Sequence, residues 1–430
     1  MPTFFVQPAQ PTALSDKYEV ELPGYELWAT MIQNVHVLVG SLDVKKFSAA
    51  LSRTLQLWPH TAGRLTNDGG KYKAIEFEER PHESTSSVVL DSHVIQNDLS
   101  GLLNSPHQRS AFDFEVPLLR LKVVSFRDET TLGISWNHIL GDATAFFRFT
   151  HAFSQFYQGL HLVYPSPTFE KPIFPEPSEC TIEELRPSIC YLHELCSEEV
   201  LCKKYSQRVH TSERVNWFFE RHELETLCNS LRQRSPSAAT RLSIHDSLSA
   251  YIVTVINRIL PNQIRKIKFM DSYRFSGASF AFPDVAGNAI IEALTALPEN
   301  PTDITGIATS IRETLTHYRQ HEVISTWMSV ASHLMLAAAK ARKLFYYPPT
   351  EIIIDWCSAH FGQPESHRHH MSGHGLLYLR VFGANPWRGD DGSWHAPEGR
   401  IDISIGVPQG YRQKVLDILA QGLDSIKKDG

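Results

Sequence analysis

A proline-rich stretch near the middle of the chain is the feature that most limits how the sequence can fold. Between Tyr164 and Pro187 the sequence reads PSPTFEKPIFPEP and then, further on, RP. Proline lacks a backbone N–H and fixes φ, so this stretch cannot hold a long helix and offers few donors to a sheet. We therefore expect a long crossover that joins two halves of the chain and ends near Thr211.

Length and composition favour a large soluble protein of roughly two to three domains. The chain has 430 residues, 42% of them hydrophobic and 20% charged, which is typical of soluble globular proteins. The formal net charge is −6, and lysine and arginine form no basic cluster, so nucleic acid is not an expected partner. We see no secretory signal and no apolar run near the ~18 residues of a membrane span, and therefore expect a cytoplasmic protein.

Hydrophobic periodicity predicts the first elements of the N-terminal half. The run NVHVLVG over residues 34–40 predicts a strand. Apolar residues then recur at steps of three and four from Val44 to Trp58, which predicts an amphipathic helix. Further on, the runs over 117–126 and 130–139 resemble two strands separated by a short polar turn, so we expect a hairpin.

The second strand of this hairpin leads into a helix. Phenylalanines recur at helical spacing from Phe146 to Phe156, and Gly159 follows as a stop signal. The C-terminal half repeats the same general scheme without a repeated sequence. In this half the sequence predicts a strand and a helix over 214–231, a helix over 241–260, a strand over 264–273, and a closing strand and helix over 399–423.

The segment SWNHILGDATAFF places His138 four residues before Asp142, where the strand gives way to the helix. His138 lies on the apolar face of the strand and should point inward, because strand side chains alternate. In a chain with 21 histidines a pair at this spacing is expected by chance, so the spacing alone is no evidence of a catalytic pair. A buried core histidine followed by an aspartate that caps a helix is therefore the structural alternative to a catalytic base.

Several segments, in order along nearly the whole chain, resemble the BAHD family of acyl-CoA-dependent acyltransferases. The resemblance lies in these segments: LSRTLQLWPHTAGRL, VPLLRLKVVSF, LGISWNHILGDATAFFRF, LSIHDSLSAYI, KFMDSYR, AGNAI, IIIDWC and GRIDISIGVP. The order and spacing are more specific than the HxxxD motif alone. We read the chain as a diverged, fungal-type member of this family.

The resemblance implies a function for His138 and Asp142. In the family, the histidine is the general base that removes a proton from the acceptor, in a channel between two domains. Imidazole suits that task because its unperturbed pKa is about 6.5. The aspartate braces the loop that carries the base by pairing with an arginine. Arg274 is the expected partner here, although the family's pattern would place the arginine at position 273, where this chain has tyrosine.

Other residues are assigned by the same resemblance. Gly287 and Asn288 are expected near the CoA side, and Trp356, with Asp355 before it, is expected to line the acceptor pocket. The family's second signature, DFGWG, aligns with VFGAN, in which Phe382 and Gly383 remain as structural residues.

These matches come with departures from the family pattern. The leading aspartate and the tryptophan of the second signature are absent, and Ala143 replaces the usual glycine after the HxxxD aspartate. We expect a diverged enzyme whose base is intact.

Two clusters raise the question of a metal site. The segment HRHHMSGHG, residues 367–375, contains four imidazoles, and four cysteines lie between Cys180 and Cys202. Neither has the cysteine or carboxylate spacing of a zinc site. We expect a solvated loop and reduced thiols, with no metal and no permanently bound cofactor.

The sequence thus predicts two chloramphenicol-acetyltransferase-like domains, each a mixed sheet with helices. The first covers residues 1–175 and is completed by about 357–385, the crossover covers 176–211, and the second domain covers 212–430. The predicted function is transfer of an acyl group, such as acetyl, from acyl-CoA to a hydroxyl or amine of a specialised metabolite, by a monomer. The alternatives are a condensation-type or transesterifying enzyme with a non-CoA donor, and a non-catalytic binder on the same scaffold.

Overall fold

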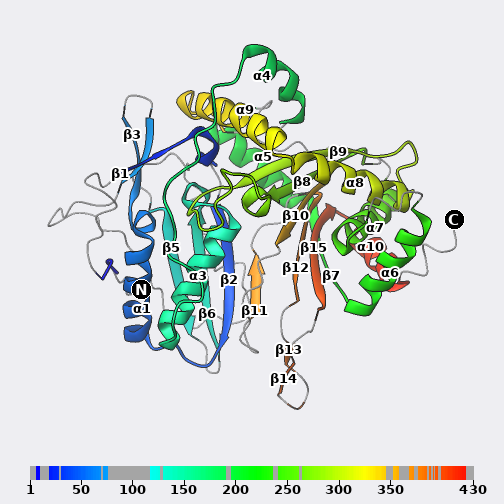
Figure 1. Cartoon of the computed structure of the whole chain (residues 1–430). Coiled ribbons are helices and arrows are strands. Elements are labelled where there is room, and N and C mark those ends of the chain that lie inside the picture. Colours follow the sequence, from blue (N-terminus) through cyan, green and yellow to red (C-terminus); the bar gives the residue numbers. More distant parts are fainter. Residues whose placement is uncertain are drawn as a thin grey trace.

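The computed structural model places helices and strands in two lobes, each built on its own sheet (Figure 1). The residues that it describes are 6–9, 19–28, 31–68, 71–75, 117–125, 129–189, 195–235, 241–260, 264–344, 352–357, 368–371, 376–384, 387–388, 391, 393–395 and 399–422.

The first lobe contains a sheet with the strand order β11-β2-β6-β5. All of its described pairings are antiparallel. Its strands are β2 (Met31–Val39), β5 (Leu119–Ser125), β6 (Glu129–Asn137) and β11 (Arg368–Met371). A smaller antiparallel sheet, in the order β1-β4-β3, lies beside it and consists of β1 (Glu19–Leu22), β3 (Arg64–Asp68) and β4 (Lys71–Ile75).

Two helices cover one face of the larger sheet, as the periodicity predicts. They are α1 (Val44–Leu57) and α3 (Ala143–Gln158). The Asp43 side chain caps α1 by accepting hydrogen bonds from two backbone N–H groups of its first turn. The α3 helix ends at Gly159, whose φ of 73° lies in the left-handed region that glycine tolerates. The apolar faces of both helices pack on Trp136 and its neighbours in β6 to form the core of the first lobe.

The crossover contains more regular structure than the sequence predicts. Residues 176–211, interpreted as a linker, include α4 (Glu179–Leu185), the 3₁₀ turn η4 (Arg186–Ser188) and α5 (Glu198–His210). The α4 helix is short and ends at Leu185, two residues before Pro187, which lies in the 3₁₀ turn that follows. The α5 helix begins beyond the last proline of this stretch, so nothing interrupts it.

The second lobe is built on a sheet with the order β7-β15-β12-β10-β8-β9. The pairings of β10 with β8 and β12 are parallel and the others antiparallel, so this sheet is mixed. Its strands are β7 (Ser212–Phe219), β8 (Lys266–Ser272), β9 (Ile290–Ala296), β10 (Ile352–Cys357), β12 (Tyr378–Gly383) and β15 (Ile401–Pro408). A short hairpin, β13 (Trp387–Arg388) and β14 (Trp394–His395), follows β12.

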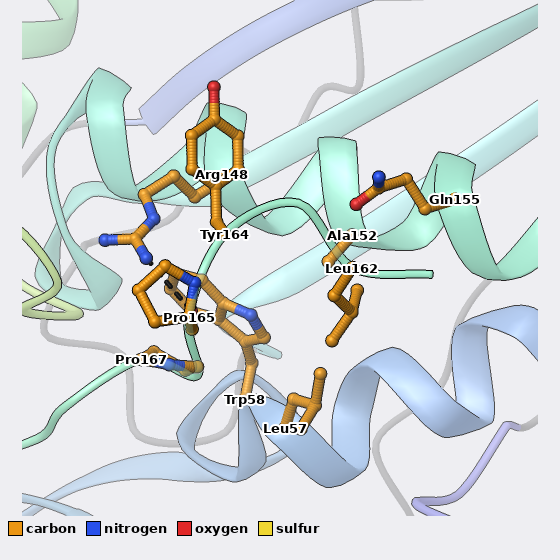
Figure 2. A pocket seen from close by; sticks show the side chains of 9 residues that line it. All are labelled: Leu57, Trp58, Arg148, Ala152, Gln155, Leu162, Tyr164, Pro165 and Pro167. Atoms are coloured by element: carbon orange, nitrogen blue, oxygen red, sulfur yellow. Dashed lines mark hydrogen bonds between the residues drawn. The ribbon is translucent and has the colours of Figure 1, made fainter. Parts of the chain in front are cut away.

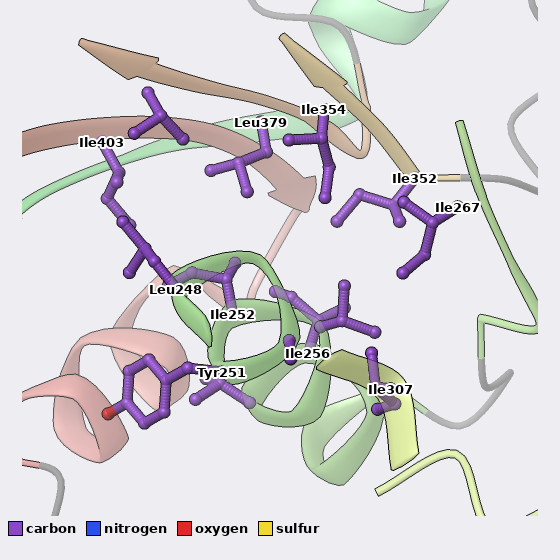
Figure 3. Close-up of a cluster of buried hydrophobic side chains, with 14 of the residues drawn as sticks. Leu248, Tyr251, Ile252, Ile256, Ile267, Ile307, Ile352, Ile354, Leu379 and Ile403 are labelled. Atoms are coloured by element: carbon purple, nitrogen blue, oxygen red, sulfur yellow. The ribbon is translucent and has the colours of Figure 1, made fainter. Parts of the chain in front are cut away.

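Helices pack against one face of this sheet and form the largest core. They are α6 (Arg221–Arg234), α7 (Ile244–Ile259), α8 (Ile304–Tyr318) and α10 (Arg412–Ala420). The α7 helix is buried on almost every side, and Figure 3 shows its Leu248, Ile252 and Ile256 facing isoleucine and leucine side chains of the strands. Apolar residues on several faces of α7 reflect this central position.

A third cluster of buried residues joins the two halves of the chain. It forms around α9 (His321–Lys340), which packs against the 3₁₀ turn η1 (Gly24–Glu26) and against α4. Tyr25 of η1 is buried there, and its hydroxyl donates a hydrogen bond to the carbonyl of Pro172 at 2.9 Å. Segments from the N-terminus, the crossover and the second lobe therefore meet above the two sheets (Figure 1).

The described strands of the segment 357–385, which the sequence assigns to the first lobe, are divided between the two sheets. The β11 strand pairs with β2 of the first lobe, but β12 pairs with β10 and β15 of the second. The β11 strand also corrects the prediction of a solvated loop over 367–375, because four of those residues form an edge strand. Sheet partners of a short edge strand depend on distant segments, which the local sequence does not reveal.

The described residues contain neither a helix that could span a membrane nor a metal-like cluster. No helix among them is both long and apolar enough to cross a bilayer. Within the same residues, no group of three or more His, Cys, Asp or Glu is arranged to hold a metal ion. Cys180, Cys196 and Cys228 carry free thiols. The other residues of the histidine-rich segment lie outside the described part, as does Cys190.

Candidate active site

His138 lies where β6 ends and the 3₁₀ turn η3 (His138–Leu140) begins. The turn is held by its neighbours. The side chain of Asn137 accepts a hydrogen bond from the N–H of Ile139 at 3.1 Å, and the indole N–H of Trp136 donates to the carbonyl of Gly141 at 2.9 Å. Trp136 is fully buried in the core. The backbone that carries His138 is therefore fixed on both sides of the imidazole.

The side-chain amide of Asn288 orients the imidazole of His138. Its Oδ1 lies 2.8 Å from Nδ1 of His138, while its Nδ2 lies 2.8 Å from the carbonyl oxygen of His138 and 2.9 Å from Oε2 of Glu26. Both partners of Nδ2 are acceptors, so the NH₂ group must face them and Oδ1 must face the ring. Nδ1 of His138 therefore carries the hydrogen, and Nε2 carries the lone pair of a base.

Asp142 is buried beside this turn and is fully engaged. Its Oδ1 accepts hydrogen bonds from Nη2 of Arg274 at 2.9 Å and from the N–H of Ala145 at 3.0 Å. Its Oδ2 accepts one from the N–H of Ala289 at 3.0 Å. Burial alone would raise the pKa of the Asp142 carboxyl, but the charge of Arg274 and these hydrogen bonds outweigh burial and hold the pKa below its usual range.

Asp142 thus combines the two structural tasks expected from the sequence. It caps α3 through Ala145, and it pairs with Arg274, the residue next to the buried Tyr273. The guanidinium of Arg274 also donates to the carbonyls of Val285, at 2.7 Å, and of Gly287. Since Asp142 belongs to the first lobe and Arg274 to the second, the pair joins the lobes beside the candidate base.

Glycine is required at two positions in this region. Gly141 has a φ of 137°, and a Cβ there would lie 2.6 Å from the Cβ of Ala145 and 3.0 Å from backbone atoms of Gly287. A Cβ at Gly287 would collide with the charged ends of Glu26 and Lys171. The loop 285–289, hereafter the Asn288 loop, can therefore approach the η3 turn only because both residues lack side chains.

The sequence matches no family model and no curated protein, but solved structures match its fold. TRI101 of F. sporotrichioides, complexed with coenzyme A and T-2, is 15% identical, with 93% of this chain and 97% of that chain covered and a TM-score of 0.65. Vinorine synthase is 14% identical, with 98% of both chains covered and a TM-score of 0.61. VibH, an NRPS condensation enzyme, is 14% identical over 93% of both chains, with a TM-score of 0.52.

These structures share the arrangement described above over nearly the whole chain. The chain has the two-domain, chloramphenicol-acetyltransferase-like fold. The fold predicted from the sequence is thereby confirmed, and the loop that carries His138 lies in contact with the second lobe of this fold.

The remaining predicted site residues lie at different distances from His138. Asn288 contacts His138 directly, and Gly287 contacts Arg274 and Asp142 through its backbone. Asp355 and Trp356 lie on β10, paired with β12, and the orientation of their side chains is outside the described part of the structure.

The remnants of the second signature lie at the end of β12, in the sheet of the second lobe. Phe382 and Gly383 end β12, opposite Asp402 and Ile401 of β15. The Phe382 backbone also pairs with Cys357 of β10. The structural role that the resemblance implies for these two residues stays a prediction.

Sequence reasoning missed four residues that surround the base. The indole of Trp28 lies against the imidazole of His138, with ring centroids 5.6 Å apart. Glu26 and Lys171 form a buried ion pair, with 3.0 Å between Oε1 and Nζ. His60 lies beneath η3, where its Nε2 is 3.2 Å from the carbonyl oxygen of Leu140. His60 lies in one of the segments that resemble the family, but no motif marks Trp28, Glu26 or Lys171, and only the fold brings the four together.

The protonation state of His60 follows from its surroundings. Burial, with the nearby charge of Lys171, lowers the pKa of the His60 imidazole to about 3. The ring is therefore neutral near pH 7, and its Nε2–H donates to the carbonyl oxygen of Leu140. His60 supports the η3 turn and does not compete with His138 as a base.

A small cavity lies elsewhere, between α1, α3 and the start of the crossover (Figure 2). Its volume of about 10 Å³ has room for about one water molecule. Arg148, on its wall, pairs with Asp284 at 2.9 Å and donates to the carbonyls of Pro283 and Pro165. His138 is not on this wall, so the cavity is a packing void beside an anchored crossover and not a substrate site.

Proposed function

We propose that the protein is an acyltransferase that moves an acyl group from acyl-CoA to a hydroxyl or amine of a small metabolite, with His138 as the general base. The observation that carries this proposal is the hydrogen bond from His138 Nδ1 to Asn288 Oδ1, at 2.8 Å, which leaves the lone pair on Nε2. The fold, shared with TRI101 complexed with coenzyme A, supports the choice of donor.

In this mechanism the acceptor attacks the thioester directly. Nε2 of His138 takes the proton of the acceptor O–H or N–H as its oxygen or nitrogen bonds to the thioester carbonyl carbon. The tetrahedral intermediate then collapses and the carbon–sulfur bond breaks. The departing sulfur takes the proton from the imidazolium, so that free CoA thiol and the acylated acceptor are released. No acyl-enzyme is formed, and the imidazole ends in its starting state.

Asp142 has no direct part in this chemistry. Both of its carboxylate oxygens are occupied by Arg274 and by backbone N–H groups of α3 and the Asn288 loop. Its contribution is to hold the η3 turn against the second lobe. Because proton transfer requires hydrogen-bond reach, a fixed turn is a requirement for the base to work.

The proposal is tested by incubating the purified protein with a panel of acyl-CoAs and candidate alcohols and amines. Release of free thiol together with an acylated product, identified by mass spectrometry, is the expected result. An acylated product formed only from a carrier-bound or ester donor would instead indicate a condensation-type or transesterifying enzyme. Tight binding of a metabolite without transfer from any donor would indicate a non-catalytic binder.

A further inference from the structure

A buried ion pair lies directly behind the residue that orients His138. Glu26, in η1, and Lys171, in the proline-rich stretch that leads into the crossover, have side chains almost inaccessible to solvent, and their charged atoms lie 3.0 Å apart. Lys171 also donates a hydrogen bond to the carbonyl of Ala286 in the Asn288 loop. An ion pair buried at this depth contributes little to stability on average, so its position invites another explanation.

The other carboxylate oxygen of Glu26 is directed at Asn288. Oε2 accepts hydrogen bonds from the backbone N–H of Asn288 at 2.8 Å and from its side-chain Nδ2 at 2.9 Å. The backbone carbonyl of Glu26 lies 3.4 Å from the same Nδ2. A continuous chain of contacts therefore runs from Lys171 through Glu26 and Asn288 to the imidazole of His138.

We propose that Glu26 and Lys171 are positioning residues that set the tautomer of His138 through the side-chain amide of Asn288. If the Asn288 amide rotated by half a turn, its Oδ1 would face the Glu26 carboxylate and the His138 carbonyl, which can only accept. The Glu26 carboxylate and the His138 carbonyl together exclude that orientation, and Lys171 compensates the charge that Glu26 brings into the interior. The effect on rate rests on the proposed function, whereas the tautomer follows from the contacts alone.

Glu26→Gln should reverse this arrangement with a minimal change of shape. Glutamine has one oxygen and one NH₂ group where glutamate has two acceptors. The Lys171 ammonium would hold the glutamine oxygen more strongly than the neutral backbone N–H of Asn288 does, so the glutamine NH₂ would face Asn288 at the cost of the hydrogen bond from that N–H. The Asn288 amide would then turn its oxygen towards position 26 and its NH₂ towards His138. The ring would carry its hydrogen on Nε2 and lose its base there.

A second substitution should restore the original tautomer. In the double variant Glu26→Gln/Lys171→Met no ammonium attracts the glutamine oxygen, which is then free to accept from Asn288 as the carboxylate does. The Asn288 amide would return to its native direction. A role limited to structural stability makes the opposite prediction, because removing more buried polar contacts would then lower activity further.

The direct readout is the tautomer of His138, measured by NMR on protein labelled with ¹⁵N-histidine. The spectra are recorded at about pH 8.5, where an ordinary imidazole is neutral. The His138 signals are assigned by their loss in His138→Gln. We expect Nδ1–H in the wild type and in the double variant, and Nε2–H in Glu26→Gln. Glu225→Gln, which neutralises one end of an exposed ion pair with Arg221, is the matched control and should leave the tautomer unchanged.

The kinetic readout is the rate of CoA-thiol release. Since a base in the wrong tautomer can cost on the order of 10⁴-fold, we expect Glu26→Gln to lose at least ~100-fold in kcat with little change in the KM for acyl-CoA. The double variant should recover at least ~10-fold of that loss. An Nε2–H tautomer in the wild type, or an unchanged tautomer in folded Glu26→Gln, would overturn the inference.

The two readouts separate this inference from the proposed function. If the wild type transfers no acyl group but the tautomers follow the expected pattern, the positioning role holds and the acyltransferase proposal fails. If Glu26→Gln does not fold, the wild type and the double variant decide the matter. Both should show Nδ1–H, and Nε2–H in either one contradicts the proposal.

Discussion

At the scale of single residues, the structure explains why a carboxylate is needed at position 142. Asp142 compensates the buried guanidinium of Arg274, which also holds two carbonyls of the Asn288 loop. Removing one partner of a buried pair leaves an uncompensated charge in the interior, which costs about 3–5 kcal/mol. The aspartate is therefore a structural requirement of the site, even though it does not touch the reacting atoms.

We predict that Asp142→Asn lowers the free energy of unfolding by about 3–5 kcal/mol and reduces activity together with stability. Urea unfolding followed by circular dichroism measures the first effect. Asp271→Asn is the matched control, because Asp271 pairs with the half-exposed Arg319, and exposed pairs contribute about 1 kcal/mol or less. Equal losses in the two variants would contradict the account of Asp142.

The lowered pKa of Asp142 also predicts how its contribution varies with pH. A carboxyl whose pKa is lower in the folded state stabilises the protein above the unfolded pKa of about 3.9, and that stability is lost as pH falls through the folded pKa. The difference in unfolding free energy between wild type and Asp142→Asn should therefore be constant from about pH 5 to 8 and shrink in stronger acid. A difference that grows in acid would contradict this sign.

The sequence revealed some of the site residues and concealed others, for a physical reason. His138, Asp142 and Arg274 lie in segments that resemble a known pattern, so their pairing could be anticipated. Glu26 lies 262 positions from Asn288, in a segment with no pattern of its own. A long-range contact of this kind becomes visible only when the fold brings a turn of the N-terminal segment beneath the Asn288 loop.

At the scale of elements, the α3 helix is defined at both ends by its sequence. Asp142 caps its start, and Gly159 ends it with a φ of 73°, at a position where an added Cβ would have no atom within 4 Å. Helix ends of this kind follow from local chemistry, which is why the sequence placed them correctly. The α4 helix and β11 were missed because a proline closely follows the first and a histidine-rich run forms the second. The α5 helix lies beyond the last proline and was missed because its residues were assigned to the linker.

We predict that two glycine substitutions around α3 differ in their effects. Gly159→Ala meets only backbone strain and should cost about 1 kcal/mol of unfolding free energy, with activity unchanged. Gly141→Ala meets strain and also a Cβ contact of 2.6 Å with Ala145, so it should cost more and lower kcat. Urea unfolding and thiol release measured on both variants provide the comparison, and similar results for the two would contradict the close approach at Gly141.

At the scale of the whole molecule, the two lobes are joined through the Asn288 loop. On one side Arg274 and Asp142 hold it, and on the other side Glu26 and Lys171 do. The candidate base lies between these two ion pairs. The position of His138 relative to the second lobe therefore depends on contacts from both halves of the chain and from the crossover.

We predict that Gly287→Ala weakens this junction. Its Cβ would displace the Glu26–Lys171 pair from behind Asn288, at a cost of about 1–3 kcal/mol for overpacking. We expect lower kcat, and faster proteolysis of the crossover because its anchor, Lys171, is disturbed. Gly410→Ala is the control, since its φ of 85° imposes strain but no atom lies within 4 Å of the added carbon. A normal rate in Gly287→Ala would contradict a tightly packed junction.

The most direct measurement of the central claim is the rate of CoA-thiol release by His138→Ala beside the wild type, with an acyl-CoA and an acceptor identified in the panel. Circular dichroism first establishes that the variant is folded. General-base catalysis contributes about 10²- to 10⁴-fold, so the account predicts a loss of at least ~100-fold in kcat. A folded His138→Ala protein that turns over at nearly the wild-type rate would contradict it.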